Sequence, residues 1–210
     1  MSDVEIVEEI AAIYDPVEDG RWDILLREKE NGGVHVGLRE IAGTSVVIFR
    51  GSITPLDWLD DAESELFGFI GGFESLGPLP LGFMQGMTQT FRKLAPLVKS
   101  KVIIGGHSLG SARAAIFGGM LVSHGTLPSR VVLCGCPRPG MATLRAHLSD
   151  VPVANYKNGH DYVTDVPSDP PYEQVRPFTC IDGGQDSVPG PFMYHHVQYY
   201  VAGVKRLLAS

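Results

Sequence analysis

The chain has 210 residues, of which 44% are hydrophobic and 20% are charged. These values are ordinary for a globular protein, and a chain of this length can bury a core without disulfides or a structural metal. The net charge of −7 argues against nucleic acid and against an anionic membrane as partners, since both attract positive surfaces. We therefore expect a single domain over residues 1–210.

The cysteines and the N-terminus do not indicate secretion or membrane insertion. Cys134, Cys136 and Cys180 cannot all pair within one chain, and their spacing resembles neither a disulfide framework nor a zinc site. The acidic N-terminus lacks the apolar run of a signal peptide. No stretch reaches the roughly 20 apolar residues that span a bilayer. We therefore expect a cytoplasmic protein without a transmembrane segment, and the oligomeric state stays open.

In chain order, hydrophobic spacing predicts a helix over 4–14, then strands over 22–27 and 34–41 joined by a turn at 31–33. Strands are expected next at 45–49, 102–104, 131–133 and 151–156, with helices at 82–99, 111–123, 142–147 and 197–208. Strand and helix alternate from about residue 45, which indicates an α/β fold. The short, continuously apolar strands are typical of a mostly parallel central sheet that is covered by helices on both faces.

The segment Gly106-His107-Ser108-Leu109-Gly110 matches the pattern Gly-x-Ser-x-Gly. A buried strand runs into it, and a helix of small residues leaves it. This context is that of a nucleophile elbow, in which a strained backbone exposes the serine hydroxyl. A serine that merely caps a helix would not require the flanking glycines. We therefore predict an α/β-hydrolase with Ser108 as nucleophile and the backbone N–H of Leu109 as one oxyanion donor.

A serine nucleophile needs a histidine base and a carboxylate that orients it, and in this fold the acid precedes the histidine. Two adjacent histidines, His195 and His196, follow a loop near the C-terminus. The other histidines precede the serine, lie in the elbow, sit at helix ends or lie further from the C-terminus: His35, His107, His124, His147 and His160. Asp161 follows a strand end, as a triad acid should. Four further carboxylates compete with it on spacing: Asp165, Asp169, Asp182 and Asp186.

Three further segments accompany the elbow: Val47-Ile48-Phe49-Arg50-Gly51-Ser52, Trp58-Leu59-Asp60-Asp61 and Gly135-Cys136-Pro137-Arg138-Pro139-Gly140. Together they resemble the motifs of the class 3 lipase family, the fungal-type triacylglycerol lipases and their relatives. The resemblance covers residues 46–200. It implies hydrolysis of carboxylic esters, in particular lipid or acylglycerol esters, through a Ser-His-Asp triad and an acyl-enzyme. It implies neither a cofactor nor a metal.

The resemblance also chooses among the candidates for acid and base. The family acid opens the pattern Asp-x-Val-Pro-x-Leu-Pro, which is similar to Asp161 to Pro167, so Asp161 is expected to be the acid. The family histidine stands in His-x-x-Tyr-Phe, which His196 fits, whereas His195 is out of register by one. The resemblance therefore implies His196 as the base, and the N–H of Ser52 as the second oxyanion donor.

Residues 53–81 combine glycines with large apolar side chains, and their position matches the lid of this family. A water-exposed segment seldom carries so many apolar groups. We expect four aromatic residues to cover an acyl pocket and to open at a lipid surface: Trp58, Phe67, Phe69 and Phe73. In the alternative interpretation, these side chains simply fill the core.

Three rival functions stay open at this stage. A metal-dependent hydrolase could use a cluster of His160, Asp161, His195 and His196, although it would leave the elbow unexplained. A non-catalytic lipid-binding protein could use the same fold, because a fold does not guarantee a function. Among serine hydrolases, a phospholipase A1, a feruloyl esterase or a thioesterase would share every residue named above.

Overall fold

The computed structural model describes residues 1–15, 20–52, 67–187, 190 and 192–209. Its centre is a seven-stranded sheet in the order β1-β2-β3-β6-β7-β8-β9. The strands are β1 (Ile24–Leu26), β2 (Val36–Ile41), β3 (Thr44–Phe49), β6 (Val102–His107), β7 (Arg130–Cys134), β8 (Val153–Asn158) and β9 (Thr179–Ile181). The first three pair in an antiparallel manner, and every pair from β3 to β9 is parallel. The predicted mostly parallel α/β sheet is therefore confirmed.

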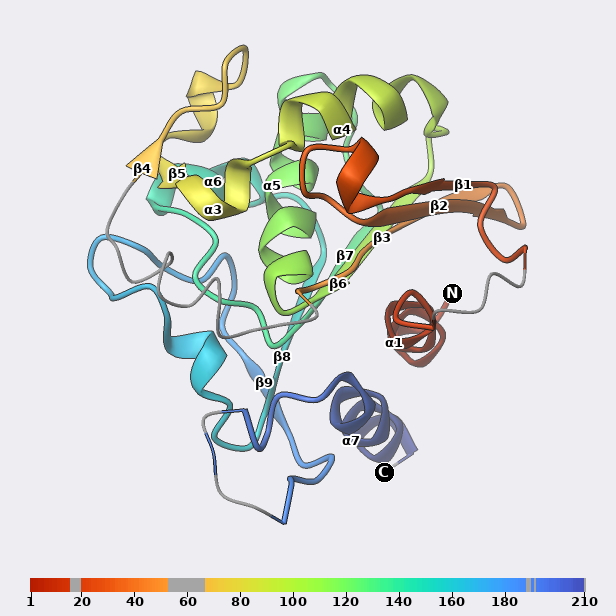
Figure 1. Cartoon of the computed structure of the whole chain (residues 1–210), viewed down its shortest axis with the longest axis vertical. Coiled ribbons are helices and arrows are strands. Elements are labelled where there is room, and N and C mark those ends of the chain that lie inside the picture. Colours follow the sequence, from red (N-terminus) through yellow and green to blue (C-terminus); the bar gives the residue numbers. More distant parts are fainter. Residues whose placement is uncertain (16–19, 53–66, 188–189, 191, 210) are drawn as a thin grey trace.

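Helices cover both faces of this sheet (Figure 1). On one face, α1 (Asp3–Ala12) packs against α7 (Val197–Ala209). On the other lie α3 (Leu81–Met84), α4 (Met87–Leu94), α5 (Leu109–Ser123) and α6 (Ala142–His147). Within the described part of the chain, no helix is long and apolar enough to cross a bilayer.

The side chains of the central strands alternate between the two faces. Val47 and Phe49 of β3 belong to the core beneath α5, whereas Val46 and Ile48 belong to the core beneath α1 and α7. Because consecutive strand residues point to opposite faces and both faces are covered, apolar residues are favoured at successive positions of the central strands. This explains the continuous apolar runs from which the sheet was predicted.

The prediction of a single helix over 82–99 is wrong, because the helix is interrupted between α3 and α4. Gly86 adopts a φ of 74°. A Cβ atom at this position would lie 2.5 Å from the carbonyl oxygen of Gly32 and 2.8 Å from that of Asn31. The close approach of this loop therefore requires a glycine at position 86. Its left-handed backbone conformation is incompatible with a continuous right-handed helix. Pro96 lies in a separate 3-10 turn, Ala95–Leu97.

The described part of the predicted lid forms a small hairpin. β4 (Phe67–Gly68) pairs with β5 (Leu79–Pro80), and a 3-10 turn, Glu74–Leu76, lies between them. Ile70 and Leu76 of this hairpin are buried in the core beneath α5. The hairpin is thus packed on the helical layer, near the C-terminal end of α5 (Figure 1).

Candidate active site

Ser108 connects β6 to α5 through the strained turn that the sequence predicts. Its φ of 59° and ψ of −135° are sparsely populated for a residue with a side chain. A Cβ atom at Gly106 would overlap the carbonyl oxygen of Gly110, and one at Gly110 would overlap that of Phe49. Both flanking glycines are therefore required for the close approach of β3, β6 and α5. The nucleophile-elbow geometry is confirmed.

The parallel register brings the carboxyl ends of the strands together around Ser108. Phe49 of β3 is opposite Gly106, and Cys134 of β7 is opposite His107. The residues after the strands therefore meet at one edge. A Cβ atom on Gly51 would lie 2.9 Å from the Cβ of Ser108. Ser108 N–H also donates to the Cys134 carbonyl at 3.0 Å, which holds the elbow against β7.

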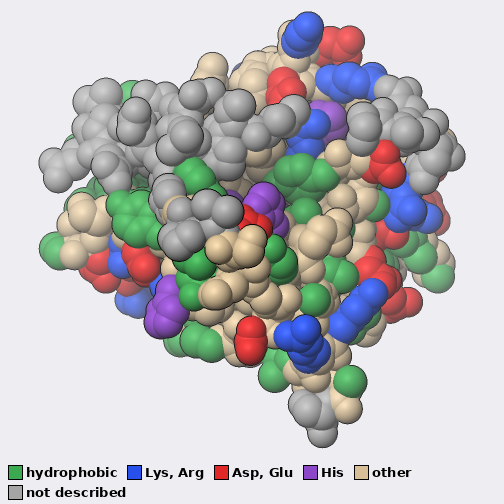
Figure 2. Space-filling model, turned by 60° about the horizontal axis from the view of Figure 1, so that its bottom comes forward, with side chains coloured by type: hydrophobic (Ala, Val, Ile, Leu, Met, Phe, Trp, Pro, Cys, Tyr) green, Lys and Arg blue, Asp and Glu red, His purple; other side chains and the backbone are tan. Residues whose placement is uncertain are grey.

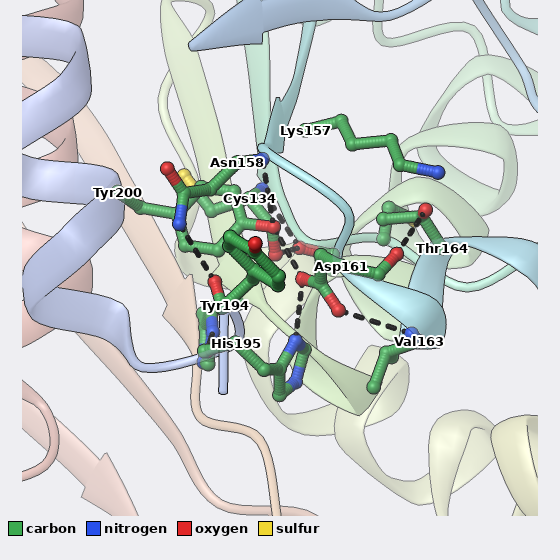
Figure 3. Close-up of polar contacts among 12 residues, drawn as sticks. Cys134, Lys157, Asn158, Asp161, Val163, Thr164, Tyr194, His195 and Tyr200 are labelled. Atoms are coloured by element: carbon green, nitrogen blue, oxygen red, sulfur yellow. Dashed lines mark hydrogen bonds and ion pairs between the residues drawn. The ribbon is translucent and has the colours of Figure 1, made fainter. Parts of the chain in front are cut away.

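Asp161 lies after β8 and is fully buried, with donors on both carboxylate oxygens (Figure 3). Oδ2 lies 2.6 Å from His195 Nδ1 and also accepts from the hydroxyl of Tyr200, while Oδ1 accepts from the N–H of Val163 at 3.0 Å. Burial by itself would raise the pKa of Asp161, but His195 and the hydroxyl of Tyr200 outweigh it and lower that pKa. Asp161 is therefore held as a carboxylate.

The contact with Asp161 also determines the tautomer of His195. An ionised carboxylate only accepts, so Nδ1 must carry the proton, and Nε2 of the neutral ring is left as an acceptor. Nε2 of His195 and Oγ of Ser108 are both buried, and neither has a hydrogen-bond partner among the described residues. Buried polar atoms are rarely left without partners except where chemistry uses them. Within the described residues, the site therefore presents a buried ring nitrogen and a buried hydroxyl that no hydrogen bond occupies.

His196 does not contact Asp161. The prediction that His196 is the base held by this acid is therefore wrong. Its Nε2 lies 2.9 Å from Asp186 at the exposed surface, and Tyr199 donates to the same carboxylate. Adjacent residues of the turn before α7 point in opposite directions. His195 is 3% exposed and points inward, so the base predicted one residue later in the chain lies outside the site.

Of the competing carboxylates, Asp165 forms an exposed ion pair with Lys157 at 3.1 Å, and Asp186 holds His196. Neither contacts the inward-facing histidine. The cluster that a metal-dependent hydrolase would need is also separated, because His196 and Asp161 have different partners. Among the residues with described positions, no three His, Cys, Asp or Glu side chains are placed to share a metal ion.

One predicted oxyanion donor, Leu109, lies within the elbow, and the other, Ser52, follows the end of β3. Leu109 is the first residue of α5, so its N–H has no partner within the helix. Ser52 follows Gly51, whose backbone lies against the side chain of Ser108. Both segments therefore lie beside Ser108, and their role as oxyanion donors stays a prediction.

The four predicted lid residues differ in their positions. Phe73 is buried against Phe91 and His124, with ring centroids 4.8 Å and 4.9 Å away. His124 caps the C-terminal end of α5, which is roughly 24 Å from Ser108 along the helix. The prediction that Phe73 covers an acyl pocket is therefore wrong, and Phe73 fills the core, as in the alternative interpretation. Phe67 and Phe69 are 54% and 53% exposed. Trp58 lies outside the described residues.

Sequence reasoning missed two residues that surround the site, Tyr14 and Tyr200, and gave His107 no role. The imidazole of His107 lies 4.6 Å from the ring of His195, centroid to centroid. Burial and the neighbouring His195 lower the pKa of His107 to about 3, so its ring is neutral. Tyr14 is 93 residues away from His107 in the chain, and no local pattern connects the two.

We expect the free energy of unfolding to fall as the pH drops from about 6.5 towards 3, because His107 has a lower pKa in the folded than in the unfolded state. The unfolded chain binds the proton first, so His107 contributes a slope of about 1.4 kcal/mol per pH unit inside this window. Urea unfolding at a series of pH values measures it. His107→Asn should flatten the slope, whereas the core variant Ile104→Val should retain it. Equal slopes in wild type and His107→Asn would contradict the prediction.

The sheet, the elbow and the order of the site residues define an α/β-hydrolase fold. The chain matches the class 3 lipase family over residues 46–170, which is more than half of its length. The chain therefore belongs to the class 3 lipase family and is a carboxylic ester hydrolase. Comparison with curated protein sequences finds no match.

Solved structures of fungal lipases share the fold. A lipase from Rhizopus microsporus var. chinensis is 22% identical with a TM-score of 0.63, over 79% of this chain and 68% of that one. A Yarrowia lipolytica lipase is 19% identical with a TM-score of 0.64, over 86% and 79%. The mono- and diacylglycerol lipase of Aspergillus oryzae is 19% identical with a TM-score of 0.62, over 91% and 83%.

Proposed function

We propose that this protein hydrolyses acylglycerol or related lipid esters through a triad of Ser108, His195 and Asp161. The observation that carries the proposal is the state of His195. Asp161 holds its Nδ1–H at 2.6 Å, and neither its Nε2 nor the hydroxyl of Ser108 has a hydrogen-bond partner in the part of the chain that the structure describes. A base with this tautomer and a strained serine are the two components that acyl transfer requires.

The reaction proceeds in two stages. His195 Nε2 takes the proton of Ser108 as Oγ attacks the ester carbonyl, and the oxyanion is stabilised by the N–H groups of Ser52 and Leu109. The carbonyl then re-forms, and the alcohol leaves with the proton from His195. Water repeats these steps on the acyl-enzyme and releases the carboxylic acid. Asp161 stabilises the imidazolium that forms in each stage.

The surface near the hairpin supports a nonpolar substrate. Phe67, Phe69 and Leu81 are exposed, and the backbone of Gly68 packs against the Leu81 side chain. On the face shown in Figure 2, several hydrophobic side chains are exposed between polar and charged ones. Acylglycerols are also the substrates that the Aspergillus oryzae relative is named for. An apolar surface of this kind suits an acyl chain better than a charged substrate.

We expect hydrolysis of p-nitrophenyl esters from acetate to palmitate and of emulsified mono-, di- and triacylglycerols. We also expect a fluorophosphonate to label Ser108 stoichiometrically, with the modified residue located by peptide mass spectrometry. EDTA is the control for a metal-dependent hydrolase and should leave the rate unchanged. Absence of both hydrolysis and labelling would contradict the proposal and favour a non-catalytic binding protein, whereas labelling with activity only on non-lipid esters would contradict the substrate class.

A further inference from the structure

We infer that Tyr14 and His107 are positioning residues that hold the oxyanion segment and the base in one hydrogen-bonded chain, an inference that rests on the proposed function. The hydroxyl of Tyr14 lies 2.8 Å from His107 Nδ1 and 3.0 Å from the backbone nitrogen of Gly51. His107 Nε2 lies 2.7 Å from the carbonyl oxygen of His195. These hydrogen bonds thus join the end of α1, the end of β3, the elbow and the loop before α7.

The atom types determine the direction of every hydrogen bond in this chain. A carbonyl oxygen only accepts, so His107 Nε2 must carry a proton and donate it to His195. The neutral imidazole has no second proton, so its Nδ1 accepts from the hydroxyl of Tyr14. The oxygen of Tyr14 then accepts from the N–H of Gly51. No member can reverse its role without leaving a buried group unsatisfied, which makes the arrangement rigid.

One end of this chain controls the oxyanion segment. Gly51 is tightly enclosed: a Cβ atom there would lie 2.6 Å from the Tyr14 hydroxyl oxygen and 2.7 Å from the His107 carbonyl oxygen. Only glycine fits, yet glycine has the largest backbone freedom of any residue. The hydrogen bond to Tyr14 removes that freedom one residue before Ser52. It therefore fixes the direction of the Ser52 N–H, which must point at the developing oxyanion.

The other end controls the base. His107 holds the backbone carbonyl of His195, and the two rings lie 4.6 Å apart, centroid to centroid, with 31° between their planes. A charged ring at this distance would repel the imidazolium that His195 becomes during the reaction. The buried His107 is neutral, so it supports the ring of His195 without opposing its charge. One side chain therefore aligns the base, while its partner Tyr14 aligns the oxyanion donor.

Tyr14→Phe removes the hydroxyl that connects the two ends and leaves the Asp161–His195 contact intact. We expect kcat to fall about 10- to 100-fold with an almost unchanged KM, because a misaligned oxyanion donor affects the transition state and not the bound ester. An alkylboronic acid, which forms a tetrahedral adduct on the serine, should bind weaker by a similar factor. The affinity for the product fatty acid should not change.

Tyr156→Phe is the matched control. The hydroxyl of Tyr156 donates to Asp3 at 2.6 Å, also in a buried position, but it does not belong to the hydrogen bonds that connect Tyr14, His107 and His195. We expect it to lower stability but to keep kcat within about twofold. If Tyr14→Phe does not fold, His107→Gln is tested in its place. The side-chain amide of Gln is too short to bind both the Tyr14 hydroxyl and the His195 carbonyl. It should show the same split between kcat and KM.

Wild-type kcat and boronic acid affinity in Tyr14→Phe would overturn the inference, and so would an equal loss of kcat in Tyr156→Phe. Failure of the proposed function gives a different result. In that case the wild-type protein itself neither hydrolyses esters nor reacts with the fluorophosphonate at Ser108, whatever residue stands at position 14.

Discussion

Ser108→Ala should lower kcat for ester hydrolysis by about 10⁴-fold or more, because no other group in the site can form the acyl-enzyme. The loss of activity should come without a loss of stability. The hydroxyl of Ser108 is buried without a hydrogen-bond partner among the described residues. Removing an unsatisfied hydroxyl is neutral or stabilising, so the melting temperature should be equal to or higher than that of the wild type.

Ser111 provides the matched control for this measurement, since it lies directly after the elbow, in the first turn of α5, and its hydroxyl is hydrogen-bonded. Its Oγ donates to the carbonyl of Gly106 at 2.6 Å and accepts from the N–H of Cys134 at 3.0 Å. Ser111→Ala should therefore lower the free energy of unfolding by about 1–3 kcal/mol while ester hydrolysis persists. Hydrolysis that survives Ser108→Ala would exclude Ser108 as the nucleophile.

His195→Ala should reduce kcat about as severely as Ser108→Ala, whereas His196→Ala should change it only slightly. The reason is direct: His195 Nδ1 lies 2.6 Å from Asp161 inside the protein, and His196 faces Asp186 at the surface. Groups of a triad act as a unit, so loss of the base alone costs about 10⁴-fold or more. Steady-state kinetics on one p-nitrophenyl ester distinguishes the two variants.

The two variants also differ in stability. His195→Ala leaves the buried Asp161 with Tyr200 and Val163 as its remaining donors, which weakens the stabilisation of a buried charge. His196→Ala removes only an exposed contact with Asp186, and exposed contacts of this kind are worth about 0–1 kcal/mol. Thermal unfolding should therefore report a clear loss for the first and almost none for the second. The reverse order of activities would show that the base is the outer histidine.

The fold and half of the site follow from local patterns in the sequence. Continuous apolar runs such as Val102 to Ile104 predict buried parallel strands, because alternation is lost when both faces are covered. The glycines around Ser108 predict the elbow, because no other residue permits β3 and α5 to approach so closely. Asp161 could be chosen because a strand end and a family-like motif coincide there. For the strands and the elbow, the physical cause lies within a few neighbouring residues, whereas the choice of Asp161 also depended on the family resemblance.

The remaining features depend on contacts between distant parts of the chain. The choice of His195 over His196 depends on which side of a turn faces inward, and a shift of one residue is invisible in spacing alone. Gly86 breaks a helix because a loop about 50 residues earlier in the chain passes against it. Phe73 lies in a segment whose glycines and apolar side chains are typical of a lid, but its own side chain packs against Phe91 and His124.

Tyr14 shows the difference most clearly. By itself it is a tyrosine at the end of an amphipathic helix, and nothing near it in the chain indicates a role. Packing of α1 on the sheet brings its hydroxyl to Gly51 and to His107, which follow it by 37 and 93 residues. The sequence by itself therefore determined the fold and the strained turn at Ser108, and the resemblance to the class 3 lipase family favoured Asp161 as the acid. Only the tertiary structure decided which side chains face the nucleophile, because that depends on directions set by packing between elements far apart in the chain.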